Sequence, residues 1–221
     1  MKIKKYQGFA LLEVLLAVIV FAIATYGVIV FSSRYMQSTQ VSAVERQATA
    51  ISSNYLPYLD TTVPTGADTN DDPINDGKFA VSFLQSIGIT DGDMSASSGN
   101  VYVNTHLPIN GSSSSQMAGC HATVSPKSST SSYVSSQSVL ILGFNALGSQ
   151  LNALIGDEKN NFAIYAPTGG EGSFADAKGN PVTQLIDPKY NNTPYSVYLV
   201  YPAVVDSTNV NFVGCDGFSA P

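Results

Sequence analysis

Three oxygen-bearing side chains alternate along one polar stretch of this chain in the order that opens a calcium-binding loop, D-x-N-x-D: Asp68, Asn70 and Asp72. The glycine that turns an EF-hand loop is replaced by Pro73, and the acid that closes it is replaced by Phe79. These replacements exclude an EF-hand. A solvated acidic turn is the favoured interpretation, and a looser calcium site that includes Asp71 and Asp76 is the alternative.

Other residues that could do chemistry are not grouped in a useful pattern. His106 and His121 have no acid at metal-ligand spacing, which favours surface or packing roles for both. The glycine-rich stretch 169–172 lacks the lysine and the strand–helix context of a phosphate-binding loop. No G-x-S-x-G motif occurs. The sequence therefore predicts neither an enzyme nor a resident cofactor.

Composition narrows the class of protein further. The 221 residues include 10 basic and 16 acidic side chains, a net charge of -6, and only 12% are charged. An acidic chain of pI about 4.6 has no basic surface for nucleic acid, so no nucleic-acid partner is expected. The low charge and the many Ser, Thr, Asn and Gly residues are typical of a secreted or surface protein.

The N-terminal segment is predicted to cross a membrane. Lys2, Lys4 and Lys5 precede an apolar run over 9–31 that contains a single acidic residue, Glu13, and no basic one. About 23 helical residues reach roughly 34 Å, enough for a bilayer core of about 30 Å. The lysines should stay cytoplasmic, which places the rest of the chain on the other side. The run is too long for a secretory signal peptide, and no A-x-A-like site closes it.

Glu13 is the unexpected residue of this segment. A carboxylate in a spanning helix costs about 2.5–3.5 kcal/mol at the centre and less near an end, so it usually has a partner. The alternative is that Glu13 lies shallow enough to reach the cytoplasmic headgroups.

The string GFALLEVLL, residues 8–16, resembles the class III signal of type IV pilins and of the pseudopilins of type II secretion. The resemblance implies that a prepilin peptidase cuts between Gly8 and Phe9, that Phe9 becomes the methylated N-terminus, and that Glu13 is the fifth mature residue. Many major pilins carry a proline at about the position of Val30. In this respect the helix is more similar to certain minor pilins and minor pseudopilins.

The resemblance also implies a role for Glu13 in assembly. Cleavage would make the Phe9 amine a new positive charge, which the Glu13 carboxylate of a staggered neighbouring subunit could meet. In a low-dielectric bundle an unpaired charge is strongly destabilising, so the pair would set the register of subunits. The implied partners are other pilin subunits, the prepilin peptidase, the pilus assembly platform and, before assembly, the bacterial inner membrane. The implied final location is an extracellular filament.

The expected layout has four parts: a leader over 1–8, a transmembrane and assembly helix over 9–31, an amphipathic continuation over 32–56, and an extracytoplasmic globular domain over 57–221. Pro57 should end the helix. Two helices with a break near residues 32–33 are the alternative. Apolar residues at spacings of three and four should face a sheet: Val41, Val44, Ala48, Ile51 and Tyr55.

The globular domain should contain an antiparallel sheet, because short strand candidates alternate with Gly, Asn and Pro turns. Strands are expected over 101–103, 139–144, 162–166, 195–201 and 210–213, and a short helix over 78–89. The Ser-dominated stretch 111–138 is interpreted as a flexible surface excursion. The expected fold class is α+β, with the long N-terminal helix packed on the sheet in a pilin-like arrangement.

Cys120 and Cys215 are the two cysteines of the chain. After export they would lie in an oxidising compartment, where a disulfide is expected. It would close a loop of about 95 residues and stabilise the fold by about 4–5 kcal/mol in the chain-entropy model. A redox-active pair, the alternative, has no C-x-x-C spacing behind it. Type IV pilins often carry a C-terminal disulfide in a similar place.

Three hypotheses for function remain. The leading one is a structural subunit, major or minor, of a bacterial type IV pilus, favoured by the Ser-rich region and the disulfide-bounded C-terminal region. The second is a pseudopilin of a type II secretion system. The third is a membrane-anchored extracytoplasmic binding protein or enzyme, which no feature of the soluble part supports.

Overall fold

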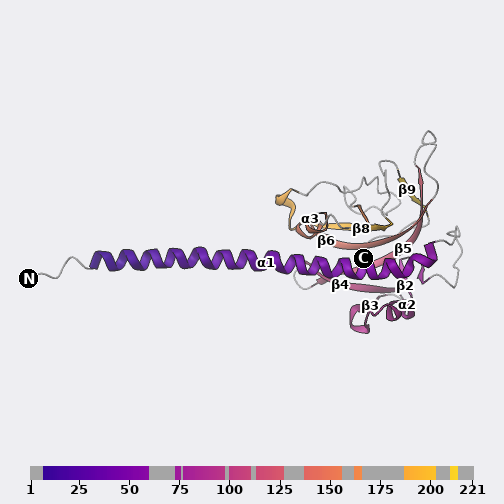
Figure 1. The fold of residues 1–221 in the computed structure, drawn as a ribbon, viewed down its shortest axis with the longest axis horizontal. Helices are drawn as coiled ribbons and strands as arrows, with labels where there is room; N and C mark the ends of the chain where they lie inside the picture. The colour runs from indigo at the N-terminus through magenta and orange to yellow at the C-terminus, as the bar shows by residue number, and fades with distance from the viewer. Residues whose placement is uncertain are drawn as a thin grey trace, which may run out of the picture. The chain divides into compact units, whose positions relative to one another are not determined.

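The computed structural model describes residues 7–59, 73–75, 77–97, 100–110, 113–126, 137–155, 162–165, 187–202 and 210–213. The chain divides into two compact units, Met1–Thr39 and Gln40–Pro221, and each is described by itself. Helix α1 (Gln7–Leu59) runs through both units, whereas every described strand belongs to the second (Figure 1).

The first unit is the apolar part of α1. Four consecutive residues, Val18 to Phe21, are between 49% and 73% exposed. Consecutive helical residues point about 100° apart, so large apolar side chains surround this part of the helix on every side. Its most apolar window has a mean hydropathy of 2.8, and α1 is the one helix in the described ranges that is long and apolar enough to span a membrane.

The end of α1 differs from the sequence-based boundary. The helix continues through Pro57 to Leu59, whereas Pro57 was expected to end it. A proline removes one backbone hydrogen bond to the residue four positions earlier, but in the last turn little helix follows that could be broken. Leu59 is buried in the core of the second unit, and this burial favours the extra residues.

A mixed-length antiparallel sheet of seven strands forms the second unit. Its order is β3-β4-β5-β6-β8-β7, and β9 pairs with β5. All the pairings are antiparallel. The strands are β3 (Met94–Ser97), β4 (Asn100–Asn110), β5 (Ser113–Pro126), β6 (Gln137–Leu147), β7 (Ala163–Tyr165), β8 (Pro194–Tyr201) and β9 (Val210–Val213). The expectation of an α+β chain with a long apolar N-terminal helix and an antiparallel sheet is therefore confirmed.

The part of α1 that follows Gln40 packs on this sheet. Its residues at spacings of three and four are buried, as the periodicity predicts: Val41, Val44, Ala48, Ile51 and Tyr55. They share one apolar cluster with Met117 of β5, Phe144 of β6 and Leu199 of β8. Figure 1 shows this part of the helix lying along the sheet, with β4 on one side and β6 and β8 on the other.

Strand β5 corrects the interpretation of 113–126 as part of a surface excursion over 111–138, whereas residues 111–112 and 127–136 lie outside the described residues. Residues 113–126 form a central strand that pairs with β4, β6 and β9. The small residues of β5 suit this position, because the ring of Phe79 lies where a Cβ on Gly119 would have to go. The side of the sheet away from the α1 cluster is also buried, as Cys120, Ile141 and Val200 show.

Short elements surround the sheet. They are a ribbon of β1 (Ile74–Asn75) and β2 (Lys78–Phe79), helix α2 (Val81–Ser86), the 3-10 turn η1 (Asp91–Asp93), helix α3 (Gly148–Ile155) and the 3-10 turn η3 (Pro188–Tyr190). The helix expected over 78–89 is therefore shorter, because its first two residues pair as β2. The other strand candidates all contain strands, and the one over 101–103 extends as far as Asn110.

Candidate functional site

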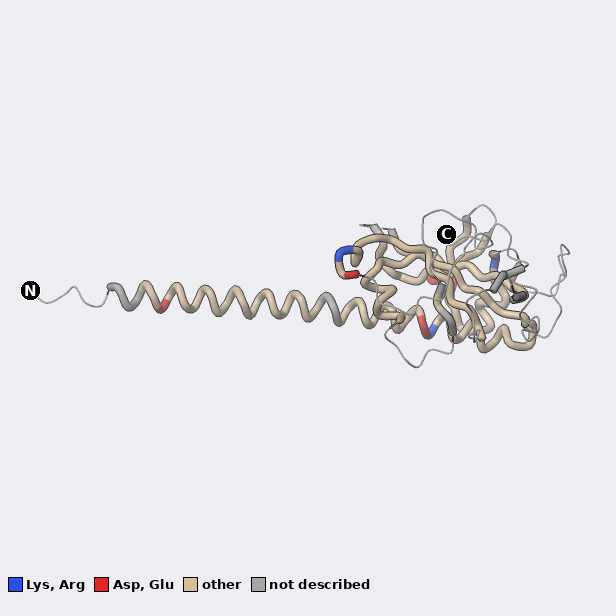
Figure 2. The backbone as a smooth tube through the Cα atoms, turned by 90° about the horizontal axis from the view of Figure 1, so that it is seen from above, with Lys and Arg blue, Asp and Glu red and all other residues tan. Residues whose placement is uncertain are grey.

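The first turns of α1 hold the residues for which the sequence predicts processing and assembly. The helix begins at Gln7, so Gly8 and Phe9 lie in its first turn and Glu13 one turn further on. Glu13 is exposed and is the one acidic or basic residue between positions 9 and 33, and Figure 2 draws most of this stretch in tan. Cleavage at Gly8, methylation of Phe9 and the assembly role of Glu13 stay predictions.

Cys120 lies in β5, is 2% exposed and is disulfide-bonded. Its expected partner, Cys215, lies outside the described residues. Strand β9 ends at Val213, which pairs with Thr123 of β5. This pairing brings the chain to within two sequence positions of Cys215 beside the strand that carries Cys120, in agreement with the expected bond.

The calcium loop considered from the sequence cannot be placed. Asp68, Asn70 and Asp72 lie outside the described residues, as do the further acids Asp71 and Asp76. Within the described ranges, no group of three or more His, Cys, Asp or Glu side chains could hold a metal ion. Calcium binding and the solvated acidic turn both stay predictions for these residues.

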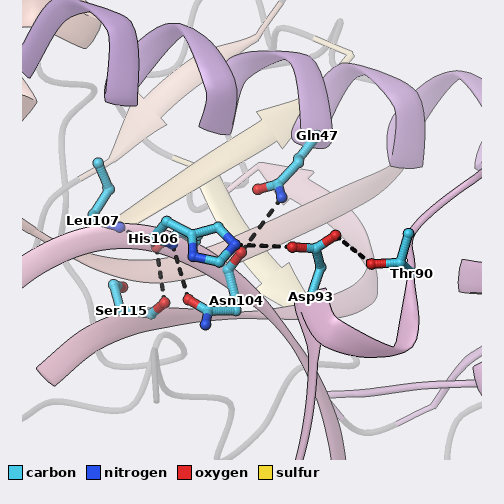
Figure 3. A network of polar contacts seen from close by, with 8 residues as sticks. Gln47, Thr90, Asp93, Asn104, His106, Leu107 and Ser115 are labelled. Carbon is cyan, nitrogen blue, oxygen red and sulfur yellow. Dashed lines mark hydrogen bonds and ion pairs between the residues drawn. The ribbon is translucent and has the colours of Figure 1, made fainter. Parts of the chain in front are cut away.

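A bulge in β4 lies at the centre of a network of polar contacts in the second unit (Figure 3). The β4–β5 register passes from Asn104 opposite Gln116 to Pro108 opposite Ser114, so three residues of β4 oppose Ser115 alone. His106, in the middle, has a φ of +56°, which non-glycine residues adopt rarely and at a cost of about 1–3 kcal/mol.

Hydrogen bonds and burial hold this bulge in place. The backbone N–H of His106 donates to Asn104 Oδ1 at 2.9 Å. On one side of His106, Thr105 is 1% exposed and its hydroxyl donates to the Ser115 carbonyl at 2.8 Å. On the other side, Leu107 is fully buried. Because both neighbours of His106 are fixed inside the fold, its imidazole is directed outward.

The imidazole meets a carboxylate from η1. His106 Nε2 lies 2.9 Å from Asp93 Oδ1, and the Thr90 hydroxyl donates to Asp93 Oδ2 at 2.7 Å (Figure 3). The side chains of His106 and Asp93 are 56% and 35% exposed. The hydrogen bond from His106, and then that from Thr90, hold the pKa of Asp93 below its usual range.

The chemistry available to this pair is limited. A carboxylate on one imidazole nitrogen fixes the orientation of the ring, as in many metal and general-base sites. The threonine hydroxyls of the network do not donate to the imidazole, since Thr90 donates to Asp93 and Thr105 donates to a backbone carbonyl. In this part of the described structure no nucleophile contacts the imidazole, so the pair is a polar link between η1 and β4.

Sequence reasoning found only part of this arrangement. It assigned surface or packing roles to the two histidines, and His121 is indeed buried with its ring edge-on to Tyr55 at 5.5 Å. It missed the acid partner of His106, because Asp93 is thirteen residues away and only the sheet register brings the two together. Asn104, two residues before His106, is the one local signal, since Asn often bonds the backbone two residues ahead.

The chain matches no protein-family model, and no curated protein or solved structure matches it.

Proposed function

We propose that the chain is a structural subunit, major or minor, of a bacterial type IV pilus. In this proposal a prepilin peptidase processes the chain between Gly8 and Phe9, and the subunit polymerises through α1. The observation that carries the proposal is the GFALLEVLL string at the beginning of a helix long and apolar enough to span a membrane. The inner membrane, the peptidase, the assembly platform and other pilin subunits are the proposed partners.

The exposure of α1 supports this proposal on physical grounds. A helix that is apolar on every side needs a lipid or protein environment all round. Leu11, Phe21 and Phe31 are each at least 70% exposed in the single chain. A membrane can cover these side chains before assembly, and helices of neighbouring subunits can cover them in a filament. A single subunit in water would expose them all.

Glu13 gives such an assembly a specific register. Its carboxylate sits in an otherwise uncharged stretch, where an unpaired charge costs several kcal/mol once water is excluded. The amine of a processed Phe9 is the nearest new cation in sequence. When two subunits are displaced along the filament axis, the amine of one meets the carboxylate of the other only at a defined offset. Other offsets leave both charges buried and unpaired.

The second unit would be displayed by the polymerised helix. Residues 41–59 of α1 belong to the core of the α+β unit, so a subunit held by its helix carries the folded unit with it. This division between an assembly helix and a folded unit built on the same helix is what the pilin resemblance implies. The pilin-like interpretation of the fold is part of the proposal.

A pseudopilin of a type II secretion system is the alternative within the same resemblance. One argument against it has weakened, because residues 113–126 of the Ser-rich region form strand β5 instead of a displayed surface loop. The two alternatives differ in where the polymer is found. Sheared extracellular filaments that contain the chain support the pilus, whereas a chain that stays with the cell envelope in a secreting strain supports the pseudopilus.

The test is incorporation of a Glu13→Gln variant into filaments. The substitution keeps the size of the side chain and removes its charge, so we expect membrane insertion and cleavage as in the wild type but at least a tenfold loss from sheared filaments. Gly27→Ala is the control in the same helix, because it leaves the charge of α1 unchanged and nothing within the subunit lies within 4 Å of the added Cβ. Equal incorporation of Glu13→Gln and wild type would refute the register role.

A further inference from the structure

The contact between His106 and Asp93 lies at the end of the outermost hairpin of the sheet. Strand β3 is an edge strand, and its ladder with β4 runs from Ser97 opposite Asn100 to Met94 opposite Val103. The next pair in this register would be Asp93 opposite Asn104. The backbone ladder stops before this pair, and the side-chain contact between Asp93 and His106 joins η1 to β4 instead.

The strained backbone of His106 lies at that contact. In a regular strand, the side chains of positions 104, 106 and 108 would share one face and alternate with 105 and 107. This alternation of burial is kept through the bulge, with Thr105 and Leu107 buried and His106 exposed, and the positive φ falls on His106 itself. Figure 3 shows the ring of His106 turned toward Asp93, which lies beside it on η1.

Among the described residues, the carboxylate that contacts the imidazole comes from η1. Asp93 contacts the ring, whereas Asp91, the other acid of η1, accepts a hydrogen bond from Gln85 Nε2 at 3.0 Å. The other elements of the network contribute neutral polar groups, namely Gln47 from α1, Asn104 from β4 and Ser115 from β5. The charge of the imidazole therefore acts mainly on the carboxylate of Asp93.

We propose that His106 and Asp93 form a proton-sensitive latch that holds edge strand β3 against β4. Imidazole is the side chain that ordinarily changes charge near neutral pH. A protonated imidazole adds a full positive charge to the hydrogen bond that it donates to the ionised carboxylate of Asp93, and this attraction strengthens the contact. The latch is tightest when the ring is protonated and Asp93 is ionised, and loss of the ring proton loosens it.

The consequence concerns the free edge of the sheet. Strand β3 covers the Asn100–Val103 part of β4, and an uncovered strand edge is a template for pairing with another chain. The latch therefore sets how often this part of β4 is uncovered. Because both side chains are partly exposed to solvent, the effect is modest, about a two- to fivefold change in the opening of β3.

Hydrogen–deuterium exchange of the full chain in detergent micelles tests the latch. Exchange of the β3 and Asn100–Val103 amides is measured at about pH 5.5 and about pH 8, on either side of the ordinary histidine pKa, and corrected for the intrinsic rate at each pH. We expect opening to be about two to five times more frequent at the higher pH in the wild type. Amides of β6, in the middle of the sheet, report whether the fold as a whole stays intact.

Three variants separate the latch from other effects of pH. His106→Asn keeps a residue that tolerates positive φ and removes the titrating ring, and Asp93→Asn removes the carboxylate without touching the bulge. Both should show the same corrected opening at the two pH values. Asp91→Asn, the matched control in the same turn, should behave as the wild type.

Equal opening of β3 in the wild type at both pH values would overturn the proposal. It would also be overturned if the pH dependence persisted in Asp93→Asn. If the β6 amides lose protection in His106→Asn, the comparison of Asp93→Asn with the wild type is the test, because residue 93 has an unstrained backbone and this variant should keep its fold.

Discussion

Tyr55 connects three elements of the second unit, and its removal is the sharpest test of how α1 packs. The side chain is fully buried. Its ring stacks on Tyr58 at 5.4 Å and meets Phe83 of α2 edge-on at 6.3 Å and His121 of β5 edge-on at 5.5 Å. Tyr55→Ala therefore removes contacts within α1, to α2 and to the centre of the sheet at once.

The expected loss follows from burial. Truncation of a buried aromatic residue to alanine costs about 3–5 kcal/mol, including the cavity that remains. Tyr58, which is partly buried, can relax toward the cavity, whereas His121 is fixed by the strand that carries it. For a unit of this size, each kcal/mol lowers the melting temperature by about 2–4 °C. We expect Tyr55→Ala to melt about 6–20 °C lower than the wild type.

Leu56→Ala is the matched control, since Leu56 is the next residue of the same helix and is 56% exposed. It should change the free energy of unfolding by less than about 0.5 kcal/mol. The assay is urea unfolding of the full chain in micelles, followed by near-ultraviolet circular dichroism of its 12 tyrosines, because the chain has no tryptophan. Equal losses for the two variants would show that this face of α1 does not pack on the sheet.

Three further changes test other parts of the structure. Gly148→Ala should destabilise the second unit by about 1–2 kcal/mol in urea unfolding, because the new Cβ would collide with the backbone carbonyl oxygen of Tyr190 and the gain in helix propensity offsets only about 1 kcal/mol of this cost. Unchanged stability would refute this packing. Because the pKa of Asp93 is lowered in the fold, its ionised carboxylate stabilises the protein above its unfolded pKa, and this contribution is lost as the pH falls through the folded pKa. In Asp93→Asn the urea midpoint should therefore depend less on pH below about pH 4 than in the wild type. An unchanged acid profile would contradict this prediction. Cys215→Ser should cost about 4–5 kcal/mol and lower the melting temperature of the exported protein, whereas two free thiols in the exported wild type would rule out the bond.

Strong local patterns made the helix and several strands predictable. The spacing of Val41, Val44 and Ile51 marks the buried face of α1 because the partner surface is continuous over several turns. The alternating Tyr and Val residues of β8 mark that strand because its central position rewards large branched and aromatic side chains. In both places local propensity and tertiary packing favour the same structure.

Strand β5 was missed because its sequence is suited to neighbours that lie far away in the chain. Gly119 is needed where the ring of Phe79 approaches the strand, and Ser115 accepts a hydrogen bond from the Asn145 backbone. Such small and polar residues are typical of surface loops when they are considered alone. The contact of His106 with Asp93 was missed for a related reason, because it depends on the sheet register and on a bulge.

The mass and N-terminal sequence of the mature protein test the central claim most directly. The chain should be expressed in a host that has a prepilin peptidase, and a strain without the enzyme is the control. The mature protein should begin at Phe9, read FALLEV and carry an N-methyl group, and a bulky residue in place of Gly8 should block the cut. A mature protein that retains residues 1–8 in the peptidase-positive host would contradict the proposal that this chain is a pilin.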